Sequence, residues 1–536
     1  MPPRQLTPDL FVSEQVGLAD IQVLADRGIR AIICNRPDGE DPGQPEWAMM
    51  EAEARAHGLE ARHIPVTPDT MGPSVVRDFA QAMAGLPKPV LAYCRTGKRS
   101  EMLADKAGLL NAAPQPMQSP ADKGRLHHRI VIAGGGAGGI SVAASMLRRR
   151  KGLDIAIIEP SAEHYYQPGW TMVGGGVFTQ GQTHKPTAGL MPKGVTWLKQ
   201  AVAGFDPENK EVILADNSRV GYDMLIVSMG NRLAWEAIEG LEQTLGRNGV
   251  TSNYHYDHAP YTWELIRGVR EGRALFTQPP MPIKCAGAPQ KAMYMACSAW
   301  EQSGVLDSMD VQFHTAGAVL FGVKDYVPAL QKTVDRYGIG VNLGSNLVAV
   351  DGPARKATFR IDAGERTLDF AMLHVCPPQK GNPVVAQSPL ADGAGYAEVD
   401  PLTLQHPRYP DVFALGDGCS APNAKTAAAV RQQAPVVAEN ALAVLEGRKP
   451  DAAYDGYGSC PLTVERGKIV LAEFSYGGKV APTFPKWLID GTQPSRLAWL
   501  LKEKLLPPLY WYAMLRGHEW MAGPKRLADV PRPGGA

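Results

Sequence analysis

A glycine-rich turn between an apolar strand and a helix constrains the fold more than any other stretch of the sequence. Residues 130–139 read IVIAGGGAGG, and Gly134, Gly136 and Gly139 fit the pattern G-x-G-x-x-G. Such glycines let the backbone approach a pyrophosphate, which lies at the N-terminus of the following helix. Glu159 ends the next apolar segment, about 20 residues on, where a ribose-binding carboxylate is expected. The sequence therefore predicts a Rossmann-like unit that binds a dinucleotide.

The glycine turn alone does not distinguish an FAD site from an NAD site, but two later segments favour FAD. The segment MLIVSMG, residues 224–230, resembles the strand-to-glycine crossover of flavoproteins with two dinucleotide-binding domains. Residues 411–430, DVFALGDGCSAPNAKTAAAV, read as a strand, a turn and a helix. Flavoproteins of that architecture use an acid such as Asp417 beside the ribityl or phosphate part of FAD. The order of the segments predicts an α/β flavoprotein with two Rossmann-like domains.

The middle of the chain lacks the second glycine turn that an NADH-using relative would carry. Residues 273–300, RALFTQPPMPIKCAGAPQKAMYMACSAW, occupy that place, with prolines and a cysteine instead of the turn. The strand VQFHTAGAVLFGV, residues 311–323, has no such motif either. We therefore expect electrons to enter from a donor other than NADH.

Two cysteines are candidates for the site at which electrons enter the protein. Cys285 lies among small residues ahead of a predicted helix, where Lys284 and the helix N-terminus would lower the pKa of its thiol. Cys460 follows a Gly-Ser turn and precedes a proline, so we expect a loop to hold it. Two thiols beside a flavin would support dithiol–disulfide chemistry. The alternative is that both are inert small hydrophobic residues.

Composition narrows the class of protein. Seven cysteines in 536 residues do not make a disulfide scaffold and fit a reducing compartment. A net charge of +1 gives no field that would attract nucleic acid, and we expect no metal site. Cys34 and Cys297 are predicted core thiols, and Cys376 and Cys419 spectators or auxiliaries. The N-terminus has no secretory signal pattern, and no apolar run approaches the ~18 residues of a spanning helix.

From Arg129 to about Gly523 the chain resembles the sulfide:quinone oxidoreductases, near their mitochondrial-type branch. The segments that carry the resemblance are EPSAEHYYQPGWTMVGGG (159–176), KCAGAPQKAMYM (284–295), FGVKDYVPALQ (321–331), AKTAAAV (424–430), YDGYGSCPLTVERGKIVLAEF (454–474) and PPLYWYAMLRG (507–517).

The resemblance implies that Cys285 and Cys460 are the redox pair. Sulfide would attack their bridge and leave a persulfide on one cysteine, and electrons would pass through FAD to ubiquinone. A thiol such as glutathione would then accept the sulfane sulfur. Lys425 matches a lysine on the helix that faces the flavin, where it would stabilise negative charge on the reduced ring or the quinone. A type II NADH:quinone oxidoreductase remains the alternative.

The tail from residue 487 combines apolar, aromatic and basic residues. Residues 495–526 read SRLAWLLKEKLLPPLYWYAMLRGHEWMAGPKR, with a Pro-Pro break and a Tyr-Trp-Tyr cluster. One interpretation is a helix pair packed on the protein's own core or on a second subunit of a homo-oligomer. With a quinone acceptor implied, we expect these amphipathic helices to lie monotopically on a membrane surface, at the cytoplasmic face of a bacterial inner membrane.

The N-terminal part carries a cysteine loop of its own. Residues 89–103, PVLAYCRTGKRSEML, read as a strand, a loop beginning at Cys94, and a helix. Loop N–H groups and Arg99 would form an anion cradle and lower the pKa of Cys94. Tyrosine-phosphatase loops place arginine six residues after the cysteine, where this chain has Ser100. The spacing is closer to the shorter loop of rhodanese-type sulfurtransferases, which carry sulfur as a cysteine persulfide.

With NRPDGEDPGQPEW (35–47) and HIPVTP (63–68), this part resembles the beta-lactamase-hydrolase-like family. The resemblance implies a dual-specificity-phosphatase-like fold. Lys98 departs from the small residue expected there. Asp38 would be a general acid if phosphate esters were substrates, but we expect it to cap the Pro-Asp-Gly turn.

The predicted organisation is a fusion of four segments. Residues 1–112 form the phosphatase- or rhodanese-like domain, 113–128 a linker, 129–486 the FAD-dependent domain and 487–536 the membrane tail. The predicted function is sulfide oxidation to sulfane sulfur, which Cys94 accepts or transfers. The alternative for residues 1–112 is a phosphatase.

Overall fold

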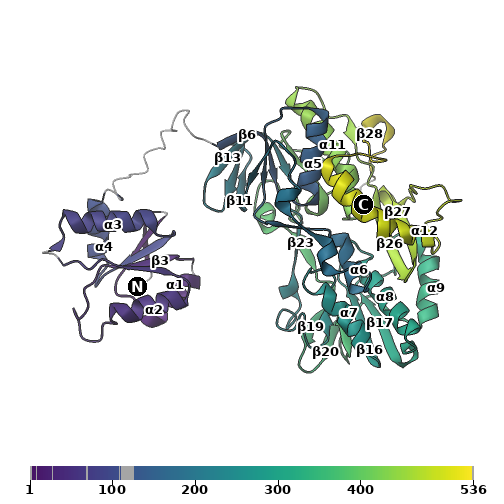
Figure 1. Ribbon diagram of the computed structural model, residues 1–536, viewed down its shortest axis with the longest axis horizontal. Coiled ribbons are helices and arrows are strands. Elements are labelled where there is room, and N and C mark those ends of the chain that lie inside the picture. The colour runs from purple at the N-terminus through teal and green to yellow at the C-terminus, as the bar shows by residue number, and fades with distance from the viewer. Residues whose placement is uncertain are drawn as a thin grey trace. The chain divides into compact units, whose positions relative to one another are not determined.

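The computed structural model describes residues 3–107, except 8, 27, 68 and 69, together with 109 and 126–533 (Figure 1). The chain forms two compact units, residues 1–124 and 125–536. Residues 113–125 of the predicted linker, 113–128, lie outside the described residues. Its last three residues do not belong to a linker, because strand β6 (Leu126–Ala133) already begins there.

A five-stranded sheet in the order β1-β2-β5-β3-β4 forms the N-terminal unit. All neighbours are parallel except β1 and β2. Alternate residues of β5 enter two cores: Val90 and Ala92 face the helices α3 and α4, whereas Leu91 and Tyr93 face α1 and α2. The elements are β1 (Arg4–Thr7), β2 (Leu10–Ser13), α1 (Leu18–Asp26), β3 (Ala31–Cys34), α2 (Trp47–Ala56), β4 (Glu60–His63), α3 (Pro73–Gly85), β5 (Val90–Tyr93) and α4 (Lys98–Lys106).

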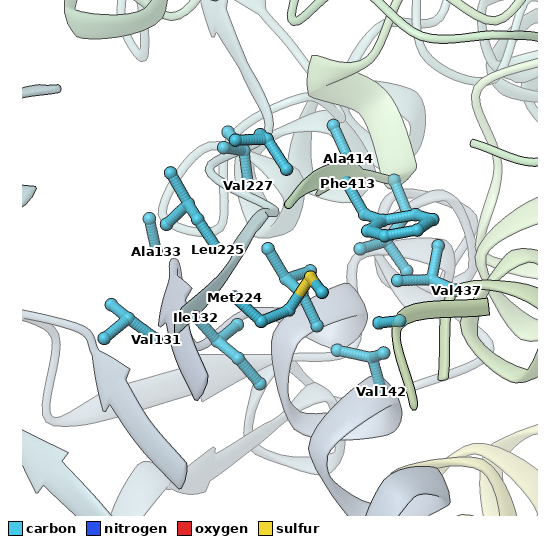
Figure 2. Packing of buried hydrophobic residues seen from close by; sticks show 14 of the residues in the cluster. Val131, Ile132, Ala133, Val142, Met224, Leu225, Val227, Phe413, Ala414 and Val437 are labelled. Carbon is cyan, nitrogen blue, oxygen red and sulfur yellow. The ribbon is translucent and has the colours of Figure 1, made fainter. Parts of the chain in front are cut away.

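The first sheet of the second unit runs β10-β7-β6-β13-β12-β11, with β24 paired to β13. Its central strands are parallel and read as continuous apolar runs, as strands covered on both faces require. Figure 2 shows residues of β6, β13 and β24 meeting the helices α5 and α11. The elements are α5 (Ala137–Arg149), β7 (Ile155–Ile158), β10 (Val195–Leu198), β11 (Val202–Asp206), β12 (Glu211–Leu214), β13 (Arg219–Val227), β24 (Val412–Ala414) and α11 (Ala427–Leu445).

A second parallel sheet follows, in the order β15-β22-β16-β17-β18. It is the counterpart of the second dinucleotide domain, and it carries the antiparallel strands β19–β21 beside it. The elements are β15 (Val250–Thr251), α7 (Ala259–Gly268), β16 (Gly272–Gln278), α8 (Ala288–Gln302), β17 (Met309–Thr315), α9 (Val327–Tyr337), β18 (Gly340–Asn342), β19 (Asn346–Asp351), β20 (Lys356–Ile361), β21 (Gly364–Asp369) and β22 (Met372–His374).

Short elements and a hairpin complete the second unit. The hairpin is β26 (Gly458–Glu465) with β27 (Lys468–Phe474), and α12 (Arg496–Leu500) packs on it. The remaining elements are β8 (Glu163–Tyr165), α6 (Trp170–Gly174), β9 (His184–Pro186), β14 (Asn231–Leu233), β23 (Gln379–Gly381), α10 (Pro383–Ala386), β25 (Ala452–Ala453) and β28 (Lys525–Arg526).

The tail is helical from residue 496 to 516 and is not broken at its two prolines. The prolines occupy α13 (Leu506–Pro508), and wider π-type turns lie on both sides of it, at Leu501–Leu505 and Leu509–Ala513. Proline has no N–H to donate, and the wider turns accommodate the interrupted hydrogen bonding. The predicted Pro-Pro break is therefore wrong.

One face of this tail is buried and another is exposed. Tyr510 and Trp511 pack against Ile140 of the dinucleotide-binding part, so the tail belongs to the second unit. Leu505 and Tyr512 are 60% and 65% exposed. No helix in the part of the chain that the structure describes is long and apolar enough to span a bilayer.

Candidate active site

The glycine turn joins β6 to α5, and its three glycines differ in what surrounds them. Gly134 has φ +102°, and a Cβ there would lie 2.7 Å from the carbonyl oxygen of Ser228. A Cβ on Gly139 would overlap the carbonyl oxygen of Gly134. Gly136, the N-cap of α5, has no neighbour within 4 Å of such an atom, so the space in front of the helix is open. The first and third glycines therefore permit the turn, and the second leaves room for a phosphate.

Two carboxylates frame the same region. Glu159 follows β7, and its side chain accepts hydrogen bonds from the N–H groups of Gly135 and Ser161, both at 2.8 Å. Asp417 lies in the turn after β24, and burial raises the pKa of its carboxyl, although Lys284 and Lys425 oppose this. Both carboxylates line the cavity that begins at the glycine turn.

This cavity has a volume of about 570 Å³ and extends from the glycine turn to the helical tail. Along it lie both carboxylates, Cys285 and residues of the tail such as Leu509 and Met514. Both polar atoms of the Asn253 side chain are buried against it and have no hydrogen-bond partner among the described residues. An open glycine turn and an orphaned buried amide fit an extended polar ligand such as a dinucleotide.

Cys285 lines this cavity, and Cys460 is next to it. The sulfur atoms of Cys285 and Cys460 are 3.8 Å apart, and the Nζ atom of Lys291 is 3.0 Å from the Cys285 sulfur. Cys285 adopts the left-handed conformation, with φ +50°, which is uncommon for a residue with a Cβ. Its N–H donates to the carbonyl oxygen of Lys425 at 2.8 Å, and this bond helps to hold the strained turn.

The two thiols differ in acidity. The hydrogen bond from Cys460 and the charge of Lys291 hold the pKa of Cys285 well below its ordinary value, against the effect of burial. The same hydrogen bond and burial raise the pKa of Cys460. Burial opposes the charged form of Lys291, but the cysteine pair outweighs it and raises the pKa of that lysine. The arrangement therefore favours a Cys285 thiolate paired with a Lys291 ammonium.

Lys502, in the tail, is a second lysine near the cysteine pair. Its side chain is 5% exposed, and its Nζ atom lies 3.4 Å from the carbonyl oxygen of Pro461. Burial, followed by repulsion from Lys291, lowers the pKa of Lys502 to about 7. The tail thus contributes a titratable group next to the cysteines.

The structure refines one local prediction about these residues and corrects two others. The Nζ atom of Lys284 donates to the side-chain oxygen of Gln167 at 2.8 Å, so this lysine acts on Cys285 through its charge, and Lys291 is the lysine at the sulfur. Cys460 is not held by a loop but lies in β26, 3% exposed, and a Cβ on Gly287 would overlap its sulfur. Lys425 is not on a helix, because it precedes the N-cap residue of α11.

The corrected position still places Lys425 at the cavity. Its Nζ atom donates to the carbonyl oxygen of Cys419 at 2.7 Å and lies 4.6 Å from the centre of the Tyr396 ring. The thiols other than Cys94, Cys285 and Cys460 are buried, and burial raises the pKa of each: Cys34, Cys297, Cys376 and Cys419. Burial outweighs the neighbours that favour a thiolate, such as Lys425 near Cys419.

The N-terminal unit has a separate thiol site at the carboxyl end of β5. Burial would raise the pKa of Cys94, but the N–H groups of Ser100, Thr96 and Arg99 outweigh it and lower that pKa. Arg99 is held on both sides: one Nη atom donates to the carbonyl oxygen of Val66 and the other to the Glu40 carboxylate, each at 2.7 Å.

One further observation concerns Asp38, and another concerns metal binding in both units. Asp38 accepts the N–H of Trp47 at 2.8 Å, so its carboxylate bonds the first N–H of α2 and not the Pro-Asp-Gly turn that was predicted. Across the described residues of both units, no three His, Cys, Asp or Glu side chains gather as they would around a metal ion.

Comparison with known proteins identifies the family of the second unit. Residues 128–280 match the family described as pyridine nucleotide-disulphide oxidoreductase. The mitochondrial sulfide:quinone oxidoreductase of Dictyostelium discoideum is 42% identical over 392 residues, which cover 73% of this chain and 86% of that protein. The chain belongs to the sulfide:quinone oxidoreductase family. It is therefore a flavin-type oxidoreductase, as the sequence predicted.

A solved structure and a second family match agree with both folds. The sulfide:quinone oxidoreductase of Aquifex aeolicus, 18% identical, superposes with a TM-score of 0.64 over 77% of this chain and 100% of its own. Residues 3–107 match the phosphatase-like domain of beta-lactamase hydrolase-like protein. Such a protein from Agrobacterium fabrum is 38% identical over 91 residues, which cover 17% of this chain and 21% of the relative. The predicted phosphatase-like fold is thereby confirmed.

In this member of the sulfide:quinone oxidoreductase family, two site residues escaped prediction from the sequence. Lys291 gave a signal, since it is the single lysine of helix α8 and is followed by the largely apolar run AMYMACSAW, and a buried lysine needs a partner. Lys502 gave none, because a lysine in an amphipathic tail reads as a solvent- or headgroup-facing residue.

Proposed function

We propose that the second unit oxidises sulfide at Cys285 and Cys460 and passes the electrons through FAD to ubiquinone. The observation that carries the proposal is the pair of sulfurs 3.8 Å apart. Of the two residues, Cys285 has Lys291 at its sulfur and lines the cavity that starts at the dinucleotide-binding turn. The substrate and the electron acceptor are inferred from the relatives, which are named sulfide:quinone oxidoreductases.

The two thiol environments assign different roles in the reaction. Hydrosulfide attacks the Cys460 sulfur of the Cys285–Cys460 disulfide, and the S–S bond breaks. Cys285 leaves as the thiolate because it has the lower pKa and Lys291 stabilises its charge, and Cys460 becomes a persulfide. A thiolate acceptor such as glutathione then takes the outer sulfur, which leaves Cys460 as a thiolate. The two thiolates re-form the disulfide and release two electrons.

FAD, when bound, would take up these two electrons and deliver them to the quinone. Gly134, Gly136 and Gly139 would admit its pyrophosphate, Glu159 its ribose, and Asp417 the part next to the flavin. The Lys425 ammonium would stabilise negative charge that develops in the cavity.

The tail would bring the enzyme to its membrane-dissolved acceptor. The cavity reaches the tail, whose exposed face carries large apolar residues, including Trp487, Leu500, Leu505, Tyr512 and Trp520. Such a face favours monotopic binding to a membrane surface. Seven cysteines in 536 residues do not make a disulfide scaffold, which favours a reducing compartment, so we place this surface on the cytoplasmic side of a bacterial inner membrane.

For the N-terminal unit we propose transfer of sulfane sulfur at Cys94. Backbone N–H groups lower the pKa of its thiol, which suits a persulfide carrier. Glu40 already neutralises Arg99, and Asp38 is used as a cap, so the loop offers neither a vacant arginine nor a general acid to a phosphate ester. A Cys94→Ser protein should keep its rate of sulfide oxidation and change its sulfane-sulfur products. An unchanged product distribution, or hydrolysis of an aryl phosphate that depends on Cys94, would contradict this role.

A steady-state assay tests the main reaction. The protein should reduce a short-chain ubiquinone with sulfide and a thiol acceptor, with one persulfide formed per quinone reduced. Reduction with NADH in place of sulfide would instead indicate a type II NADH:quinone oxidoreductase. The Cys460→Ser protein should lose persulfide formation while it retains FAD.

A further inference from the structure

A second cavity, of about 420 Å³, lies apart from the cysteine pair. Helices α7 and α8, the glycine after α6 and the turn between β26 and β27 enclose it. Its floor is apolar and consists of Ile266, Met295 and Ala299, with the Trp263 ring at one side. The mechanism proposed above uses none of these residues.

Three arginines form the rim of this cavity: Arg267, Arg270 and Arg466. None of them is ion-paired with a carboxylate among the residues that the structure describes. Arg267 lies 5.9 Å from the centre of the Trp263 ring. The Arg466 guanidinium donates a long hydrogen bond, 3.4 Å, to the carbonyl oxygen of Gly176. It also interacts electrostatically with the Glu503 carboxylate, which Lys504 and Trp499 already hold. The rim is therefore a positively charged site with an apolar floor.

The cavity adjoins the helical tail. Arg466 is in the turn of the β26–β27 hairpin, three residues before Ile469. Ile469 and Ser495 exchange backbone hydrogen bonds of 3.1 and 2.9 Å, and Ser495 caps α12. On the floor, Met295 belongs to the same apolar cluster as Trp499 of α12. The arginine rim is thus fixed to the first turn of the tail.

The outer face of that first turn is apolar. Leu497 and Leu500 of α12 are 48% and 50% exposed, and Trp487, shortly before the helix, is 84% exposed. This is the face proposed above to contact the membrane. A membrane against it would bring lipid phosphates close to the level of the arginine rim, since the helix and the hairpin are bonded together.

We propose that this cavity binds the headgroup phosphate of an anionic phospholipid. The proposal rests on the membrane contact in the proposed function. Guanidinium groups bind phosphate oxygens in bidentate fashion, and unpaired arginines incur no loss of an existing ion pair when they do so. The apolar floor would receive the glycerol and the first acyl carbons, which a site for inorganic phosphate would not need.

Vesicle flotation of the full-length, FAD-loaded protein tests the proposal. Binding is compared between phosphatidylcholine vesicles and vesicles with added phosphatidylglycerol. The triple variant R267Q/R270Q/R466Q removes the rim. The matched control R247Q/R355Q/R366Q removes three exposed arginines, likewise without a carboxylate partner among the described residues, from around the β19–β21 sheet. Sulfide oxidation with a short-chain quinone, which needs no membrane, checks that both variants fold.

We expect phosphatidylglycerol to strengthen binding of the wild type, and the rim variant to lose most of that gain. Each arginine near an anionic surface is worth about fivefold in partitioning, so the triple variant should bind anionic vesicles roughly 100-fold more weakly. The control should retain more of the gain, and the rim's share should fall as salt rises.

Three results would overturn the proposal. Equal loss in the rim variant and its control would show a general effect of charge. Equal wild-type binding to both vesicles would remove the lipid phosphate while leaving membrane contact intact, whereas binding to neither would contradict the membrane contact itself. Competition by millimolar inorganic phosphate as effective as that by soluble dihexanoyl phosphatidylglycerol would assign the rim to free phosphate.

Discussion

Replacing Lys291 with methionine should raise the pKa of Cys285. The ammonium is 3.0 Å from the sulfur, and both groups are buried away from water. A hydrogen bond to a charged group contributes about 1.5–3 kcal/mol, which corresponds to about 10- to 100-fold less thiolate at a given pH below the titration midpoint. Methionine keeps the volume of the stem, so packing should change little.

The assay is the rate of Cys285 alkylation by iodoacetamide as a function of pH. It uses the Cys460→Ser background in which Cys94, the reactive cysteine of the N-terminal unit, is also replaced. A lowered pKa keeps the thiolate present at pH values above it, so loss of Lys291 should move the midpoint upward and slow alkylation near neutral pH. Lys284→Met is the matched control, because that lysine donates to Gln167 instead. An unmoved profile in Lys291→Met, or an equal movement in Lys284→Met, would refute the reasoning.

Two further predictions concern neighbouring residues. Gly139→Ala should lower the free energy of unfolding by about 1–3 kcal/mol, since its methyl group would overlap the carbonyl oxygen of Gly134; thermal melting checks this. Gly136→Ala, with open space around the added methyl group, should keep the melting temperature of the apoprotein but retain less FAD. Lys502, with a pKa of about 7, carries its charge mainly below that pH, so Lys502→Met should slow sulfide-dependent flavin reduction at pH 6 more than at pH 8. An equal effect at both pH values would mean that its charge does not act on the cysteines.

Local motifs explain which parts of the site could be predicted from the sequence. Gly134, Gly136 and Gly139 act through the backbone of one turn, and Glu159 ends the next strand of the same βαβ unit, so spacing alone places them together. The contact between Lys291 and Cys285 also lies within one segment. Lys284, the predicted lysine, is nearer in sequence, but its Nζ atom donates to Gln167 and only its charge acts on Cys285.

Long-range packing decides the rest. Cys460 and Cys285 are 175 positions apart, and only the docking of β26 on α8 brings them together. A glycine-serine-cysteine-proline sequence looks like a loop, yet the proline is tolerated because the hairpin is a two-stranded sheet with open edges. Lys502 reaches the pair only because α12 packs on β27, a long-range contact that no local propensity indicates.

The most direct test of the central claim is anaerobic. The FAD-loaded protein is mixed with sulfide, the flavin absorbance is followed, and a short-chain ubiquinone is then added. The account predicts that sulfide changes the flavin spectrum, that quinone reverses the change, and that Cys285→Ser abolishes the response. A flavin that ignores sulfide but is bleached by NADH, or a Cys285→Ser protein that responds like the wild type, would contradict it.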